Sequence, residues 1–412
     1  MKRICAIISL LIVVSCLSSC GEKKTKISFL WWPDPGGGFE EIISDFEKKN
    51  PGINVEMIKG PTSTDAREVM YATSYLAGMH TYDMVLMDII WLPKFAARDW
   101  IIPLDEWFTK EEQKKFFPGD IKGSIYKGKI YRVPLQTDAG ILYYRKDLLD
   151  KAGVKMPGTW KQLVEMAKII QEKPELYGYV FQAKQYEGLV CNFLEILWSF
   201  GGRVFDEEGN LTLTDPEAVK ALQFMYDLVN VYGITPPGIL TYEEEESRHI
   251  FQEGRAVFCR NWPYMLTLAE NGDSPVKGKT GIGKLPRKEG MGSHSCLGGW
   301  GFGIAKFSPH RAACVKFIKY ATSPESQKKL HFKSGIVPAR KALFDDKEIL
   351  QKSPHYKELY QILLSARPRP MTPHWSRISD VLRRYIHKVL LDSLSAREAL
   401  EKAQKEIKEI VR

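Results

Sequence analysis

Tryptophans near turn-forming residues are the side chains in this sequence best suited to binding a small molecule. Of the ten tryptophans, those near Pro, Gly or Asp at predicted strand ends and loops are Trp31, Trp32, Trp91, Trp262, Trp300 and Trp375. Loops at strand ends are where α/β proteins bind ligands. Aromatic rings stack on the C–H faces of a sugar, while carboxylates and arginines bond its hydroxyls. A cleft that mixes Trp with Asp and Arg would therefore suit a sugar, although core packing is the better interpretation for any single tryptophan.

Motifs for catalysis and metal binding are absent from the sequence. The eight histidines form no H-E-x-x-H pattern, and there is no G-x-S-x-G elbow. Five residues rather than four separate Gly272 from the Gly278-Lys279-Thr280 triplet, and the segment 299–303 lacks the last glycine of G-x-G-x-x-G. We therefore expect no cofactor, no nucleotide and no metal. The acidic run 243–246 is interpreted as the solvated first turn of a helix.

The N-terminus predicts export. Lys2 and Arg3 precede the apolar run 4–14, which is too short to span a bilayer and is typical of a secretory signal peptide. The segment Leu17-Ser18-Ser19-Cys20 is similar to a bacterial lipobox. It predicts a signal peptide over 1–19, lipidation of Cys20, and a location outside the cytoplasm, on a bacterial membrane.

The charge pattern argues against nucleic-acid binding, and the cysteines leave two possibilities open. The 59 Lys and Arg exceed the 50 Asp and Glu by nine, but the two signs are interspersed, so a nucleic-acid partner is not expected. Four cysteines lie beyond residue 20, at positions 191, 259, 296 and 314. They either pair as disulfides or remain buried thiols.

Alternating strand and helix patterns organise the chain. Strand-like runs near 27–32, 53–57 and 84–87 alternate with helical runs near 39–46 and 65–76, which predicts a parallel sheet covered by helices. A second block with the same pattern begins near Ile141. Thr159 with Gln162, and Ser395 with Glu398, predict capping boxes at two helix starts. The economical interpretation is two α/β lobes.

Longer strings of the sequence point to a family. The segment LYYRKDLLDKAGV at 142–154 resembles the signature of extracellular solute-binding proteins of ABC importers, the group that includes maltose-binding protein. Further similar strings are YDMVLMDIIWLPKFAARDW, QAKQYEGLVCNFLEILWSFGG, FQEGRAVFCRNWPY, CLGGWGFGIAKFS and ARPRPMTPHWSRISDVL. The last four look most similar to the trehalose/maltose branch.

This resemblance implies a two-lobe, type II periplasmic-binding-protein fold with a hinge and a ligand cleft between the lobes. The first lobe would comprise 20–135 plus 286–335, and the second 136–285 plus 336–412. The chain would cross between lobes near Leu135-Gln136, near Leu285 and near Gly335.

The resemblance also implies the ligand contacts. Asp88 and Asp138 match carboxylates that accept sugar hydroxyls, Arg369 matches a guanidinium donor, and Trp262 and Trp300 match stacking aromatics. Arg369 lies between Pro368 and Pro370, in a stiff loop that would lose little entropy on binding. Secondary polar contacts are expected from Ser63, Arg67, Gln182 and Glu187.

The function implied is a lipid-anchored, non-catalytic and monomeric receptor. It would deliver a di- or oligosaccharide to membrane permease subunits, with the ATPase on a separate chain. An exported glycoside-acting enzyme remains an alternative, because paired carboxylates and tryptophans also describe a glycosidase. A receptor for a polyamine or a glycerophosphodiester is another, although Arg369 argues against a polyamine.

Overall fold

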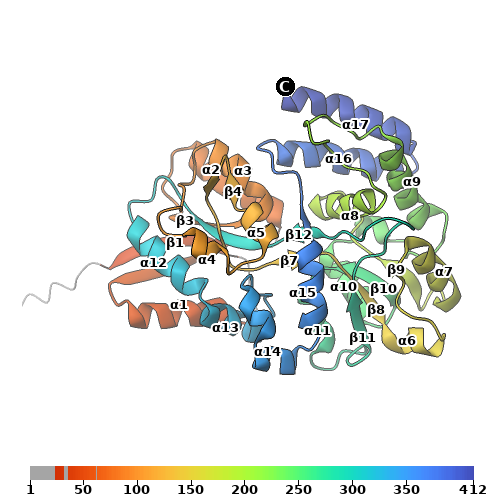
Figure 1. Ribbon diagram of the computed structural model, residues 1–412, viewed down its shortest axis with the longest axis horizontal. Coiled ribbons are helices and arrows are strands. Elements are labelled where there is room, and N and C mark those ends of the chain that lie inside the picture. The colour runs from red at the N-terminus through yellow and green to blue at the C-terminus, as the bar shows by residue number, and fades with distance from the viewer. Residues whose placement is uncertain (1–23, 32–35, 62) are drawn as a thin grey trace, which may run out of the picture.

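The computed structural model describes residues 24–31, 36–61 and 63–412. Two lobes lie side by side (Figure 1). The first contains elements from the beginning of the chain together with β13, α12 and α13 (residues 300–334), and the second contains elements from the middle and the end. The predicted signal peptide, Cys20 and Trp32 lie outside the described residues. Within the described ranges, no helix is both long and apolar enough to cross a membrane.

Besides the short antiparallel pair formed by 125–126 and 129–130, the first lobe contains two small sheets. β1 (Thr25–Trp31) and β2 (Ile53–Lys59) pair in parallel, and β13 (Trp300–Ile304) pairs antiparallel with both β3 (Met84–Asp88) and β6 (Val133–Pro134). The other elements of this lobe are α1 (Gly38–Lys49), α2 (Thr64–Leu76), η1 (Ile89–Trp91), α3 (Leu92–Ala97), α4 (Lys110–Gln113), α5 (Pro118–Lys122), β4 (Ile125–Tyr126), β5 (Lys129–Ile130), α12 (Arg311–Ala321) and α13 (Pro324–Ser334).

The second lobe is built on one four-stranded sheet in the order β11-β8-β10-β9. Its strands are β8 (Ile141–Arg145), β9 (Tyr177–Val180), β10 (Ala256–Asn261) and β11 (Thr280–Gly283). Its helices are α6 (Lys146–Lys151), α7 (Trp160–Ile170), α8 (Glu187–Ser199), α9 (Pro216–Asn230), η2 (Ile239–Thr241), α10 (Glu244–Gln252), α11 (Tyr264–Glu270), α16 (Trp375–Leu390) and α17 (Ala396–Val411).

A further, three-stranded sheet lies between the two lobes. It has the order β14-β12-β7, from β14 (Arg367–Pro368), β12 (Cys296–Gly298) and β7 (Asp138–Ala139). The segment that leads to β14 contains η3 (Lys341–Asp345), α14 (Lys347–Lys352) and α15 (Tyr356–Ser365). Because β7 and β12 come from distant parts of the chain, this sheet ties the lobes together at their centre (Figure 1).

Local sequence signals explain several element boundaries. Thr159 and Gln162 form the expected capping box at the start of α7, and Ser395 and Glu398 form the one at the start of α17. Every residue of β3 is buried, as expected of an apolar strand covered on both faces. The strands and helices predicted for the first block are confirmed by β1, α1, β2, α2 and β3 over the described residues.

The prediction of a parallel sheet is confirmed only in part. β1 and β2 pair in parallel, but β3 lies in a different sheet. β13 runs antiparallel to β3, and β8 runs antiparallel to both β10 and β11. The cause is the connectivity: β13 enters the first lobe from the second lobe, so it approaches the sheet from the opposite end. The local β-α-β rhythm cannot reveal a strand that returns more than two hundred residues later.

The passage between β12 and β13 depends on Gly299. Its φ is +118°, and a Cβ built there would lie 2.6 Å from the carbonyl oxygen of Gln136. The preceding segment belongs with the second lobe, because Arg287 N donates to Gly158 O and Lys288 N donates to Ser199 O. We therefore propose that this crossing falls at Gly299 rather than near Leu285.

Candidate functional site

Arg369 joins carboxylates of both lobes. Its guanidinium donates from Nη2 to Asp88 Oδ1 at 3.0 Å and from Nη1 to Glu187 Oε1 at 2.9 Å. Asp88 ends β3 in the first lobe, where the same Oδ1 also accepts from Ile90 N at the start of η1. Glu187 begins α8 in the second lobe. Only 3% of Arg369 is exposed, so this double ion pair is shielded from water.

Glu187 is held by three side chains. Oε1 accepts from Trp375 Nε1 as well as from Arg369, and Oε2 accepts from the Ser379 hydroxyl. Burial raises the pKa of Glu187, and the Arg369 charge and these hydrogen bonds oppose that shift. The predicted secondary contact is therefore a fixed partner of Arg369.

Two further carboxyl groups are buried beside this pair. Burial raises the pKa of Asp138 to about 8, against a hydrogen bond donated by Gln136 Nε2 to Asp138 Oδ2. Burial also raises the pKa of Asp120, on α5, to about 7, against the charge of Arg132. Near neutral pH, a substantial fraction of each carboxyl group is therefore protonated. A protonated carboxyl can donate a hydrogen bond as well as accept one.

Several buried polar atoms around these acids lack a well-formed hydrogen bond among the described residues. They are both carboxyl oxygens of Asp120, Nε and Nη2 of Arg132, Oε1 of Gln136 and Nε of Arg369, although the Thr137 hydroxyl lies near enough to Asp120 to lower its pKa. Buried polar groups are normally paired, and each orphan costs about 1–3 kcal/mol. Such a concentration of unused donors and acceptors suits a ligand rich in hydroxyls.

Strand register brings the aromatic and acidic residues together. In the β3–β13 pair Trp300 is the partner of Asp88, and in the β7–β12 pair Gly298 is the partner of Asp138. A Cβ built at Gly298 would lie 3.1 Å from both Asp138 Cβ and the Trp262 ring. The short segment 298–300 therefore has two clusters at its ends: Asp138 and Trp262 at Gly298, and Asp88 at Trp300.

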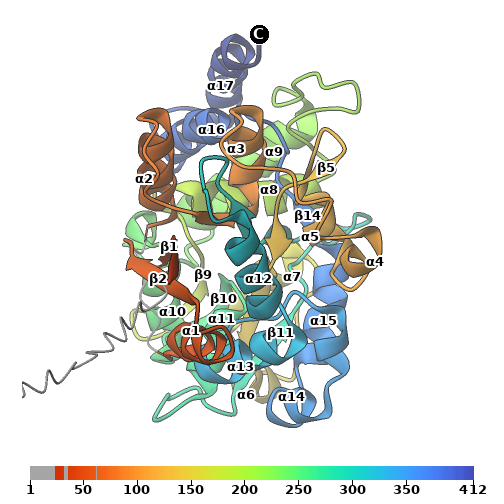
Figure 2. The ribbon, with the colours of Figure 1, turned by 90° about the vertical axis from the view of Figure 1, so that its left-hand side faces the viewer.

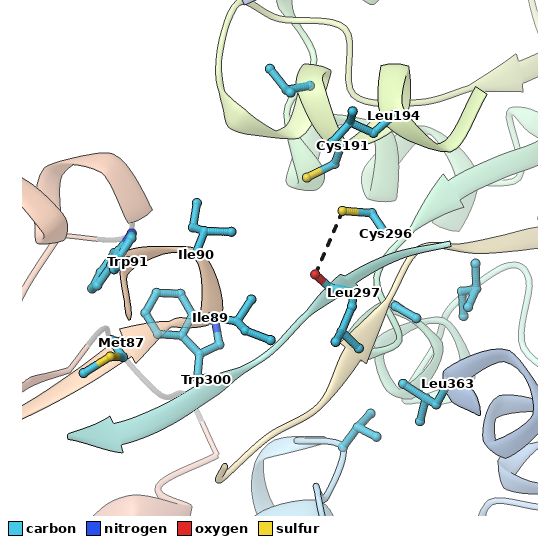
Figure 3. Packing of buried hydrophobic residues seen from close by; sticks show 14 of the residues in the cluster. Met87, Ile89, Ile90, Trp91, Cys191, Leu194, Cys296, Leu297, Trp300 and Leu363 are labelled. Carbon is cyan, nitrogen blue, oxygen red and sulfur yellow. Dashed lines mark hydrogen bonds between the residues drawn. The ribbon is translucent and has the colours of Figure 1, made fainter. Parts of the chain in front are cut away.

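Both predicted stacking tryptophans are oriented by arginines. The Arg67 guanidinium lies 4.6 Å from the Trp300 ring centre, and Trp91 meets Trp300 edge to face at 5.4 Å (Figure 3). The Arg260 guanidinium lies 4.2 Å from the Trp262 ring, whose Nε1 donates to Glu244 Oε1 at 3.2 Å. These contacts hold the rings in fixed planes.

A buried ion pair supports the second-lobe half of the site. Arg260 donates from Nε to Glu195 Oε2 at 2.8 Å and from Nη2 to Glu195 Oε1 at 2.6 Å. The same Glu195 oxygen accepts from Cys296 N, on β12. Arg260 therefore fixes both the Trp262 ring and the central sheet.

The structure brings most of the predicted residues together. Asp88, Asp138 and Trp262 lie against the segment 298–300, to which Trp300 belongs. Arg67 contacts Trp300, and Arg369 joins Asp88 to Glu187. Burial lowers the pKa of Arg67 to about 10, which leaves it charged at neutral pH.

Two predicted contacts lie apart from this group. Ser63 is exposed, and its hydroxyl accepts from Ala66 N as the cap of α2. Gln182 is buried in the second lobe, where its amide bonds Ser247, Asn192 and Arg260 and has no hydrogen-bonding capacity left for a ligand.

Sequence reasoning missed several residues of the site. Asp120, Arg132 and Gln136 carried no motif, although Gln136 lies two residues before Asp138. Glu244 belongs to the acidic run that was interpreted as solvated, but it turns inward to Trp262, and burial raises its pKa. Of the six tryptophans noted in the sequence, Trp31, Trp91 and Trp375 are almost fully buried.

The chemistry of the described residues does not include a metal centre. No three His, Cys, Asp or Glu side chains among them are grouped so that they could hold a metal ion. The four cysteines in this part of the chain are free and buried, and the sulfur atoms of Cys191 and Cys296 face each other (Figure 3).

Comparison with known proteins identifies the family. The model of the family "Bacterial extracellular solute-binding protein" matches residues 32–328. A probable ABC transporter-binding protein of Deinococcus radiodurans is 33% identical over 378 residues, covering 89% of each chain. The arabinooligosaccharide-binding protein of Halalkalibacterium halodurans is 25% identical and covers 90% of this chain and 85% of its own.

A solved structure supports the same conclusion. Maltose-bound MalE3 of T. maritima is 41% identical to this chain, with a TM-score of 0.88 over 94% of this chain and 100% of MalE3. The fold is thus the two-lobe type II periplasmic-binding-protein fold. Since the family match spans most of the chain and a relative above 30% identity covers nearly all of it, the chain belongs to the bacterial extracellular solute-binding proteins.

Proposed function

We propose that this protein is the substrate-binding component of an ABC sugar importer. It captures a di- or oligosaccharide, with α-glucosides such as maltose and trehalose as the first candidates, and delivers it to the permease. The family works outside the cytoplasm. The proposed anchor is lipid on Cys20, the proposed partners are the permease subunits, and the ATPase contributes only through them.

One observation carries the proposal. Arg369 joins Asp88 and Glu187 across the lobes, next to Asp138, Trp300 and a set of buried, unsatisfied polar atoms. Carboxylates accept sugar hydroxyls, and a protonated Asp138 can donate to a ring or hydroxyl oxygen. Trp262 and Trp300 supply apolar faces for C–H groups, so every chemical feature of a saccharide has a counterpart.

The relatives support the class of ligand. MalE3 was solved with maltose, and the Halalkalibacterium relative is named for arabinooligosaccharides. Both ligands are oligomeric sugars that lack net charge. The site agrees with such a ligand because Arg369 is neutralised by two carboxylates of its own chain.

A calorimetric titration of the protein truncated after Cys20 tests the proposal. The panel contains maltose, trehalose, maltotriose, an arabinooligosaccharide, mannitol, spermidine and glycerophosphocholine. We expect saturable binding of an α-glucoside, lost in Trp300→Ala and retained in the surface control Arg397→Ala. Binding of spermidine or glycerophosphocholine with no response to any saccharide would overturn the sugar assignment and leave the fold intact.

The glycosidase alternative has one observation in its favour. Asp138 has a raised pKa near the ion-paired Asp88, and such a division between two carboxyls is also used by glycosidases. Prolonged incubation with maltose, followed by chromatography, separates the two functions. We expect maltose to be recovered whole, and catalytic release of glucose would exclude a purely binding role.

A further inference from the structure

Besides the two ion pairs of Arg369, another ion pair joins the lobes through residues that are not assigned to the ligand. We infer that Asp65 and Arg383 form a positioning pair that holds the lobes together around bound saccharide and slows its release. The inference rests on the proposed sugar-binding function and adds to it a control of dissociation by residues that do not touch the ligand.

The pair links one helix from each lobe. Arg383, on α16 of the second lobe, donates from Nη1 to Asp65 Oδ2, on α2 of the first lobe, at 2.7 Å. A neighbouring contact joins the same two helices, because the Ser376 hydroxyl donates to Glu68 Oε1 at 2.9 Å. Figure 2 shows α2 and α16 at the same end of the molecule.

The charges of Asp65 and Arg383 each keep a favourable interaction within their own lobe when the lobes separate. Asp65 lies in the first turn of α2, where the helix dipole favours a negative charge. Arg383 also donates from Nη2 to Asp380 Oδ1 on its own helix. Opening therefore leaves neither charge buried without a partner. The attraction between Asp65 and Arg383 is gained only when the lobes meet, so it selectively stabilises the closed arrangement.

The exposure of the pair sets the size of the effect. Asp65 and Arg383 expose 48% and 23% of their side chains, so water and salt screen the interaction. Pairs of this kind typically change an equilibrium by about 1.5- to 5-fold. We expect this factor in the dissociation rate of maltose, because the pair forms after the ligand has entered, and we expect it to shrink at high salt.

The adjacent residue provides a matched control. Arg384 lies on the same helix with similar exposure, but its guanidinium donates to Glu406 of α17, within the second lobe. Alanine at either position preserves helix propensity. Arg383→Ala and Arg384→Ala therefore remove the same kind of group, and only the first removes a contact between lobes.

The experiment measures maltose dissociation by stopped-flow fluorescence. We expect Arg383→Ala to accelerate release about 1.5- to 5-fold. The charge reversal Asp65→Lys should do so more strongly, because it places two cations together. The double variant Asp65→Lys with Arg383→Glu should return to within about twofold of the wild type. Arg384→Ala should leave the rate unchanged.

Two outcomes would overturn the inference. The first is a wild-type dissociation rate in Asp65→Lys, and the second is an equal acceleration in Arg383→Ala and Arg384→Ala. Either would leave sugar binding itself intact.

If the wild type does not bind maltose, the pair is tested without ligand. Spin labels are placed on cysteines introduced at the exposed Leu76 of α2 and Leu391 at the end of α16. Asp65→Lys should deplete the short-distance population, and an unchanged distribution would refute the pair.

Discussion

Arg369 is the residue on which the two halves of the site depend. Without its guanidinium, Asp88 and Glu187 would face each other across the lobes with no cation between them. We expect Arg369→Ala to weaken saccharide binding by about 1–3 kcal/mol, or about 5- to 150-fold, with the fold retained. Calorimetry measures the affinity, and circular dichroism checks the fold. Wild-type affinity in a folded variant would show that the ligand binds elsewhere.

The buried acids make a prediction about pH. The pKa of Asp138 is raised to about 8 and that of Asp120 to about 7, whereas an unfolded Asp titrates near 3.9. Between these values the two carboxyls bind more protons in the folded state than in the unfolded state, so their contribution to the free energy of unfolding falls as pH rises. Burial lowers the pKa of His294, His331 and His355 to about 4, which gives the opposite slope below about pH 6.5. We therefore expect the free energy of unfolding to fall as pH rises from about 7 to 8. Urea unfolding across this range measures the slope.

A substitution assigns that slope to Asp138. Asp138→Asn keeps the shape of the side chain but cannot ionise, so the free energy of unfolding should fall less steeply with pH than in the wild type. Asp273→Asn, on the surface, should leave the slope as it is. If Asp138→Asn and the wild type show the same slope, the carboxyl is ionised in the folded protein and the raised pKa is wrong.

At the scale of elements, the turn at Gly299 sets the distance between the two clusters. Ala at this position would combine an unfavourable positive φ with a contact of 2.6 Å to the Gln136 carbonyl. We expect Gly299→Ala to destabilise the protein by about 1–3 kcal/mol and to weaken binding, because Trp300 must shift. Urea unfolding and calorimetry measure the two effects.

The control variant Gly272→Ala separates the cost of a positive φ from the cost of a close atomic contact. It also has a positive φ, of +57°, but a Cβ there would meet no atom within 4 Å. Gly272→Ala should therefore cost less stability and leave binding intact. Equal losses of stability in the two variants, with binding unaffected in both, would mean that the close approach of Gln136 has no role in the site.

Elements that depend on local sequence could be predicted, and those that depend on distant pairing could not. The capping boxes at Thr159 and Ser395 were found because a cap involves only a few consecutive residues. The antiparallel entry of β13 was missed because it depends on where the chain crosses between lobes. Glu244 was misjudged for a similar reason, since the side chain that turns it inward, Trp262, follows another strand.

The candidate site was predictable only in part. Asp88, Trp300 and Arg369 stand in strings that resemble the family, so the resemblance located them. Asp120 and Arg132 carry no motif, and their proximity to the site arises only when β13 is paired with β6 and β3. Because the burial of Asp120 and Arg132 depends on this pairing of distant strands, the local sequence around them shows no pattern that predicts it.

At the scale of the whole molecule, a ligand that contacts both lobes must stabilise both. Amide hydrogen exchange reports this region by region, because protection rises where opening becomes less favourable. We expect saturating maltose to slow exchange in η1, which follows Asp88, and in the first turn of α8, which begins at Glu187. Residues of α7, which the assigned contacts do not include, should change little and serve as the internal reference.

The distribution of protection separates two modes of binding. Slower exchange in both η1 and α8 requires that the saccharide links the lobes, because each segment belongs to a different one and Arg369 alone connects their carboxylates. Protection confined to η1 would mean capture by the first lobe without closure. In that case Arg369 would act as a permanent brace rather than as a ligand donor, and Arg369→Ala should lower stability more than affinity.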